Sequence, residues 1–169
     1  MPRFNPDGVP DQQNYLKAGT YYCVCVHAAD GDDHDIKMAW QARAPAGSAG
    51  DAVMDTIRFP NPDAGYSADE LQNNKGFQRT KLVCKRLGLE ERWDAGEITP
   101  ENLVGIEAYV TVHEVEGRKG SKHEGKVFGN VTFDGYKLAT EGTVPTDLAP
   151  VSKPDSFDHG ANREQGDAF

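Results

Sequence analysis

Apolar and polar residues alternate with a period of two in several short stretches, which is the pattern of half-buried β-strands. The pattern is plainest where Ile106, Ala108, Val110 and Val112 alternate with more polar neighbours. Turn residues or prolines separate the stretches, so the first three are expected to form a meander and the last two a hairpin. The five predicted strands cover residues 19–28, 36–43, 53–59, 106–113 and about 126–136.

Between the third and fourth stretches the period changes to that of a helix. Phe77, Val83 and Leu87 share one face at about 3.6 residues per turn, and the opposite face is cationic. Gly88 followed by Leu89 is typical of a helix end, because glycine adopts the left-handed conformation there and the leucine folds back on the last turn. A helix over residues 75–87 is therefore expected.

Three meandering strands, a helix and a final hairpin are the element order of an OB-fold, a partly open five-stranded barrel. We expect a mainly β domain at residues 19–142, an OB-fold-like barrel with one α-helix between strands three and four. Residues 1–18 form an extended arm in this interpretation. Residues 143–169 are predicted to be a flexible, disordered acidic tail, because they have too few apolar residues to offset the entropy of ordering.

The charge distribution changes this picture. The net charge of −9 by itself argues against a nucleic-acid partner, because phosphate binding depends on Lys and Arg. However, ten of the 18 Lys and Arg residues lie in two short windows, 75–92 and 118–126. Acidic residues gather in the first hairpin turn, at Asp30, Asp32, Asp33 and Asp35, where they would repel phosphates. Either this turn points away from the ligand or a nucleic-acid function is wrong.

Single-stranded nucleic acid needs a cationic groove and aromatic faces on which bases stack. Strands two and three and the last hairpin supply candidates for both. The alternative is that the aromatic residues belong to the core and the cations to an ordinary solvated surface. The candidate nucleic-acid-binding residues are Lys37, Trp40, Arg43, Arg58, Tyr109, Arg118, Lys119, Lys122, Lys126 and Phe128.

Catalytic and metal-binding motifs do not occur in the sequence. There is no Gly-rich phosphate loop, no G-x-S-x-G turn and no metal-ligand spacing, so no enzyme activity, cofactor or metal is expected. Cys23, Cys25 and Cys84 are interpreted as small buried apolar residues. No apolar run reaches the roughly 20 residues of a membrane helix, so we expect a cytoplasmic protein without a membrane partner.

Three short motifs carry a resemblance to a known family: residues 16–21 (LKAGTY), residues 77–89 with their RLGL ending, and residues 102–106 (NLVGI). The pattern resembles the phage-associated DUF669 proteins over about residues 15–137. This resemblance implies an OB-fold protein similar to single-stranded-DNA-binding proteins of phage replication or recombination, or a bacterial relative. Oligomeric state stays open.

The end of the chain is similar to the acidic tip with a terminal phenylalanine that bacterial and phage single-strand-binding proteins use to recruit partners. Asp167 and Phe169 are the candidate residues for recruiting replication or recombination proteins. The alternative function, from another class, is a non-catalytic protein-interaction adaptor with an acidic surface and tail.

Overall fold

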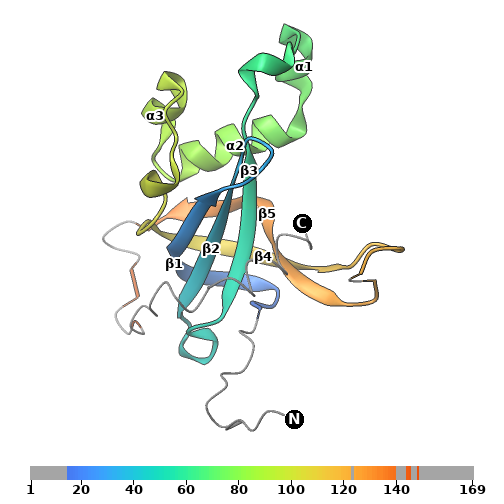
Figure 1. The fold of residues 1–169 in the computed structure, drawn as a ribbon. Coiled ribbons are helices and arrows are strands. Elements are labelled where there is room, and N and C mark those ends of the chain that lie inside the picture. The colour runs from blue at the N-terminus through green and yellow to red at the C-terminus, as the bar shows by residue number, and fades with distance from the viewer. Residues whose placement is uncertain (1–14, 123, 140–143, 146–147, 149–169) are drawn as a thin grey trace, which may run out of the picture.

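The computed structural model describes residues 15–122, 124–139, 144–145 and 148. Five strands within these residues form one antiparallel sheet in the order β3-β2-β1-β4-β5 (Figure 1). All five strands lie where the period-two pattern predicted them, with small shifts at their ends, which confirms the mainly β class. The strands are β1 (Gly19–Asp30), β2 (Asp35–Ala44), β3 (Ala52–Arg58), β4 (Glu107–Glu116) and β5 (Val127–Leu138).

The segment between β3 and β4 contains three short α-helices where the sequence predicted one: α1 (Ala68–Asn73), α2 (Lys75–Arg86) and α3 (Glu90–Ala95). The predicted helix is α2. Asn74 caps its start by accepting a hydrogen bond from the Phe77 amide at 3.0 Å. Gly88 ends it with φ +78°, and the Leu89 amide donates to the Cys84 carbonyl at 2.7 Å, as the glycine signal predicted.

The main core lies between the sheet and α2. Trp40 and Met38 of β2 pack there with Val83 of α2 and Val110 of β4, all almost fully buried. Leu16, which the sequence placed in an N-terminal arm, belongs to this core and donates its amide to the Ala52 carbonyl at 3.0 Å. The rest of that arm and most of the predicted tail lie outside the described residues.

A second, smaller cluster occupies the opposite face of the sheet, where side chains of the same strands alternate to the other side. It consists of Val24, Val26, Ala39, Ala52 and Met54. As a consequence β2 is buried on both faces along most of its length.

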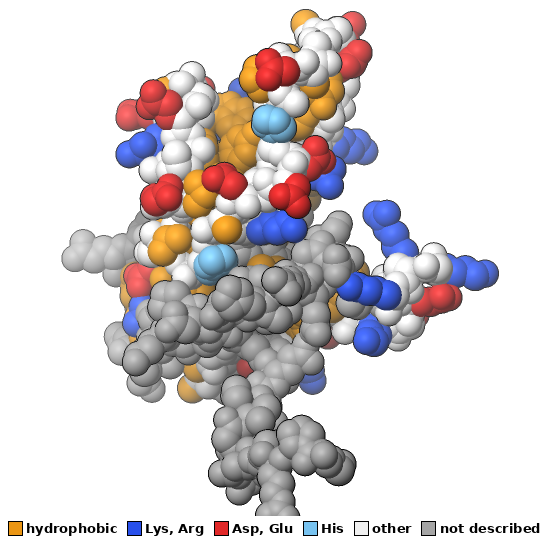
Figure 2. Space-filling view, in the orientation of Figure 1, with side chains coloured by type: hydrophobic (Ala, Val, Ile, Leu, Met, Phe, Trp, Pro, Cys, Tyr) orange, Lys and Arg blue, Asp and Glu red, His pale blue; other side chains and the backbone are white. Residues whose placement is uncertain are grey.

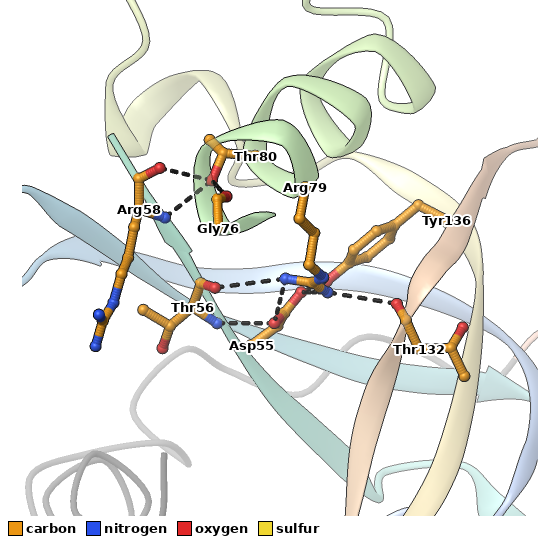
Figure 3. A network of polar contacts seen from close by, with 8 residues as sticks. All are labelled: Asp55, Thr56, Arg58, Gly76, Arg79, Thr80, Thr132 and Tyr136. Carbon is orange, nitrogen blue, oxygen red and sulfur yellow. Dashed lines mark hydrogen bonds and ion pairs between the residues drawn. The ribbon is translucent and has the colours of Figure 1, made fainter. Parts of the chain in front are cut away.

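Strands β3 and β5 are the two edges of the sheet, and no backbone pairing joins them among the described residues. The sheet is therefore open, and a barrel closed by backbone hydrogen bonds is not what the structure contains. Side chains span the gap instead: Arg79 of α2 and Tyr136 of β5 both contact Asp55 of β3 (Figure 3). This contact holds α2 over the gap between the edges.

Candidate nucleic-acid interface

The turn between β4 and β5 carries an exposed cluster of cations, which we call the basic hairpin. Figure 2 shows these Lys and Arg side chains grouped on a projection from the body of the molecule. The base of the turn is held by the Gly117 amide, which donates to the Lys126 carbonyl at 2.8 Å. The basic hairpin brings together four of the predicted binding residues, all exposed: Arg118, Lys119, Lys122 and Lys126.

A second pair of predicted cations lines a groove of about 440 Å³ beside the gap between β3 and β5. Lys37 enters it from β2 and Arg58 from the end of β3, next to Arg79. Asn130 of β5 also lines this groove, and its buried side-chain oxygen has no hydrogen-bond partner. Because β5 runs from the basic hairpin past Asn130, one strand connects the exposed cations with the groove.

The groove borders a buried ion pair. Arg79 binds Asp55 through two nitrogens, with Nη1–Oδ1 at 3.1 Å and Nη2–Oδ2 at 2.8 Å, and the Tyr136 hydroxyl donates to Oδ2 at 2.6 Å (Figure 3). Burial lowers the pKa of Arg79, but the Asp55 carboxylate outweighs burial, so the pKa rises. Burial and the same carboxylate raise the pKa of Tyr136 well above its ordinary value. Asp55 therefore neutralises Arg79, which leaves Lys37 and Arg58 as the groove cations for a ligand.

Trp40, predicted as a stacking surface, is not available to a ligand. Its side chain is 0% exposed, and its ring centroid lies 5.1 Å from that of Tyr136 inside the core. Its indole nitrogen is also buried without a hydrogen-bond partner. The prediction for Trp40 is wrong because the face of β2 that carries it points toward α2.

Arg43 and Tyr109 lie at the junction of β2, β1 and β4, apart from the groove. Arg43 forms an ion pair with Glu107, and the second oxygen of Glu107 accepts a hydrogen bond from the Tyr22 hydroxyl at 2.8 Å. The rings of Tyr22 and Tyr109 meet edge to face with centroids 5.3 Å apart. Burial, followed by the hydrogen bond and charge of Glu107, raises the pKa of Tyr22 to about 12. These contacts give Arg43 a structural partner.

The aromatic residues of β5 differ from the prediction. Phe128 is half-buried beside Leu16 and Tyr21, in a separate pocket. Phe133 lies on the same strand as the buried Val131 but is 49% exposed. A register irregularity in the pairing of β4 with β5, between Val110 and Val112, accompanies this difference. Phe133 is thus an exposed aromatic residue that was not among the predicted binding residues.

The acidic turn, residues 30–35, lies at the end of the sheet that carries the helices, whereas the basic hairpin projects from another side (Figure 1). The turn thus lies away from the basic hairpin, but its Asp35 pairs with Arg58 across β2 and β3 and lines the groove together with Lys37 and Arg58. Asp167 and Phe169 lie outside the described residues.

No protein-family model matches this chain, and no curated protein matches it. Among the described residues, no helix has the length and apolar character needed to span a membrane. Within the same residues, no group of three or more His, Cys, Asp or Glu side chains is arranged to hold a metal ion.

Proposed function

We propose that this protein binds single-stranded DNA without sequence specificity, in replication or recombination of the phage type. The observation that carries the proposal is the basic hairpin, whose four exposed cations lead along β5 to the groove with Lys37 and Arg58. Exposed cations on a projecting turn can reach phosphates and release counterions, which supplies most of the affinity in non-specific binding.

The strand order supports an OB-fold-like barrel for this domain. In an OB-fold the sheet closes between the third and fifth strands, and the helix follows the third strand. Here β3 and β5 are the edges that face each other across the Asp55–Arg79 pair, and α2 lies between β3 and β4 in the chain. The turn between the last two strands is one of the loops that bind oligonucleotides in such barrels.

Base stacking in this proposal falls to an exposed aromatic residue. Phe133 of β5 takes the place that the sequence had given to Trp40, because only an exposed ring offers a face to a base. Each base stacked on an aromatic side chain contributes about 1–3 kcal/mol.

The test is a titration of a fluorescein-labelled oligo-dT, longer than the roughly 4–16 nucleotides that one OB-fold covers, followed by anisotropy. We expect binding at about 50 mM salt that weakens strongly toward about 200 mM. No binding at the lower salt, or binding that salt does not weaken, would overturn the proposal.

A charge-matched pair of variants locates the site. Replacing Arg118, Lys119 and Lys122 together by Ala removes three exposed cations from the basic hairpin. The control replaces Lys75, Lys81 and Lys85 by Ala, which removes the same charge from the exposed side of α2. We expect the hairpin variant to bind at least about tenfold more weakly and its salt slope to fall by about 0.7 per lost phosphate contact, the value for single strands. Equal losses in both variants would place the interface elsewhere.

A further inference from the structure

A pocket of about 640 Å³ lies between the acidic turn and α3. Its apolar part is formed by Ile36 of β2, Phe59 and Pro60 after β3, and Trp93 and Ile98 from the α3 region. Figure 2 shows it as an apolar hollow with acidic side chains around it. The volume falls within the range of about 300–1,000 Å³ that is usual for ligand pockets.

Two aromatic rings give the pocket a defined wall. The centroids of Phe59 and Trp93 lie 6.0 Å apart, with an angle of 33° between the planes. The Phe59 amide donates to the His34 carbonyl at 2.8 Å, which attaches this ring to the acidic turn. The Trp93 amide donates to the Leu89 carbonyl at 2.9 Å within the first turn of α3. These hydrogen bonds anchor the backbone of both aromatic residues beside the pocket.

The rim of the pocket is acidic. Asp30, Asp32 and Asp35 line it, whereas none of its described lining residues is Lys or Arg. Asp35 is 8% exposed, and its side chain accepts a hydrogen bond from the Asp33 amide at 3.2 Å, so it shapes the turn. Asp30 and Asp32 are exposed and free to face a ligand. This rim repels phosphates and attracts cations.

We propose that this pocket binds a segment of a partner protein in which an aromatic or branched aliphatic side chain stands next to Arg or Lys. The apolar side chain fills the hollow against Phe59 and Ile98, which removes it from water. The adjacent cation lies over the exposed side of Trp93 and pairs with Asp30 and Asp32, since a guanidinium is attracted both by an aromatic face and by carboxylates. Charge complementarity selects this basic and apolar peptide over a nucleic acid.

The pocket and the basic hairpin belong to different sides of the molecule, so a peptide in the pocket leaves the hairpin accessible. The groove with Lys37 and Arg58 is closer, because Asp35 lines both the pocket and the groove. The inference does not depend on the proposed DNA function. If that function holds, the pocket places a partner protein beside DNA that is bound at the basic hairpin.

The experiment uses the full chain labelled with ¹⁵N and the probe peptide acetyl-Gly-Phe-Arg-Lys-Gly-amide. We expect saturable backbone amide shifts centred on Gly31, Asp32 and Gly96, and a change in the emission of Trp93. The peptide acetyl-Gly-Phe-Glu-Glu-Gly-amide is the charge control and is expected not to bind. Shifts located elsewhere, or equal binding of both peptides, would overturn the proposal.

Paired variants test whether the pocket itself binds the peptide or whether any acidic surface of the chain does. Asp30→Asn with Asp32→Asn is expected to weaken the basic peptide about fivefold to tenfold, in the range of two partly exposed ion pairs. The matched control, Asp63→Asn with Asp69→Asn, removes the same charge from exposed positions outside the pocket and should leave binding within about twofold. Trp93→Leu should remove saturable binding. Peptide affinity that is equal in the two double variants would contradict the assignment, as would displacement of the peptide by oligo-dT.

Discussion

The basic hairpin joins β4 to β5 and projects into solvent. The β1–β2 hairpin, in contrast, reverses direction within residues 31–34 and borders a pocket beside α3. The first carries exposed cations and the second carries carboxylates. A net charge of −9 is therefore a sum over separate surfaces of opposite sign. The comparison teaches that the overall charge excludes neither a nucleic-acid partner on one surface nor a basic protein partner on another.

The first three strands, β1 to β3, meet the strands β4 and β5 at two junctions of different kinds. Backbone hydrogen bonds pair β1 with β4, and the Tyr22–Glu107–Arg43 contacts lie over this pairing. On the other side, only side chains connect β3 with β5, through Asp55, Arg79 and Tyr136. The predictions that follow test whether the two surfaces depend on a common frame and whether they act independently.

The largest effect is expected from Asp55→Ala. This change leaves the Arg79 guanidinium and the Tyr136 hydroxyl buried without their partner. Because loss of one member of a buried ion pair costs about 3–5 kcal/mol, the free energy of unfolding should fall by that amount. Urea denaturation measures this fall. Arg86→Ala breaks only the exposed pair with Asp134 and should cost at most about 1 kcal/mol.

If the fold of both surfaces depends on the Asp55–Arg79–Tyr136 contacts, Asp55→Ala should weaken oligo-dT and peptide binding together. Arg86→Ala should then change neither affinity by much. A loss near 1 kcal/mol in both variants would show that the side-chain junction contributes little to the fold.

An alkaline transition is expected from Tyr22 at the β1–β4 junction and from Tyr136 at the β3–β5 junction. The pKa of Tyr22 is raised to about 12 in the folded chain, and that of Tyr136 is raised well above its ordinary value. The unfolded chain releases these protons near the ordinary tyrosine pKa of about 10, so the stabilisation is complete below that pH and is lost as pH rises toward 12. Urea denaturation between pH 8 and 12 measures this loss, and Tyr22→Phe should reduce the slope. An unchanged slope in the variant would assign the loss to other groups.

The smallest expected effect tests whether the acidic turn and the basic hairpin act independently on oligo-dT binding. Asp30→Asn with Asp32→Asn should raise oligo-dT affinity less than about threefold at 0.1 M salt, because both carboxylates are exposed to screening by salt and neither lines the groove. A gain of tenfold or more would show that the acidic turn lies on the DNA path, and the contrast between the two hairpins would then have to be redrawn.

The strands and α2 followed from sequence because their signals are local. Period-two alternation, the 3.6-residue period over residues 77–87 and the glycine at position 88 each act within a few residues. The helix α3 lacked such a signal, since it is one short segment and Leu89 provides no side-chain cap. The position of the basic hairpin could also be predicted, because turn-forming glycines and a cluster of Lys and Arg occur in the same segment.

The errors at the site arise from long-range packing. Alternation in β2 identifies two faces but not which face is covered, and both are covered here, so Trp40 could not be assigned to the core from sequence. Arg43 pairs with Glu107 and Asp55 with Arg79 across large separations along the chain, which no local pattern encodes. The acidic turn was visible, but the pocket required α3 to be placed beside it.

The side-chain junction between β3 and β5 also has a consequence for self-association. An open sheet has two edge strands whose backbone groups can pair with another chain, and proteins protect such edges with inward-pointing charges or covering segments. Arg79 does this here, because its guanidinium nitrogens lie 3.5 Å from the carbonyl oxygens of Thr56 on one edge and Thr132 on the other. The same side chain that neutralises Asp55 thus places an inward-pointing charge against one carbonyl of each edge strand, which disfavours pairing of these edges with another chain.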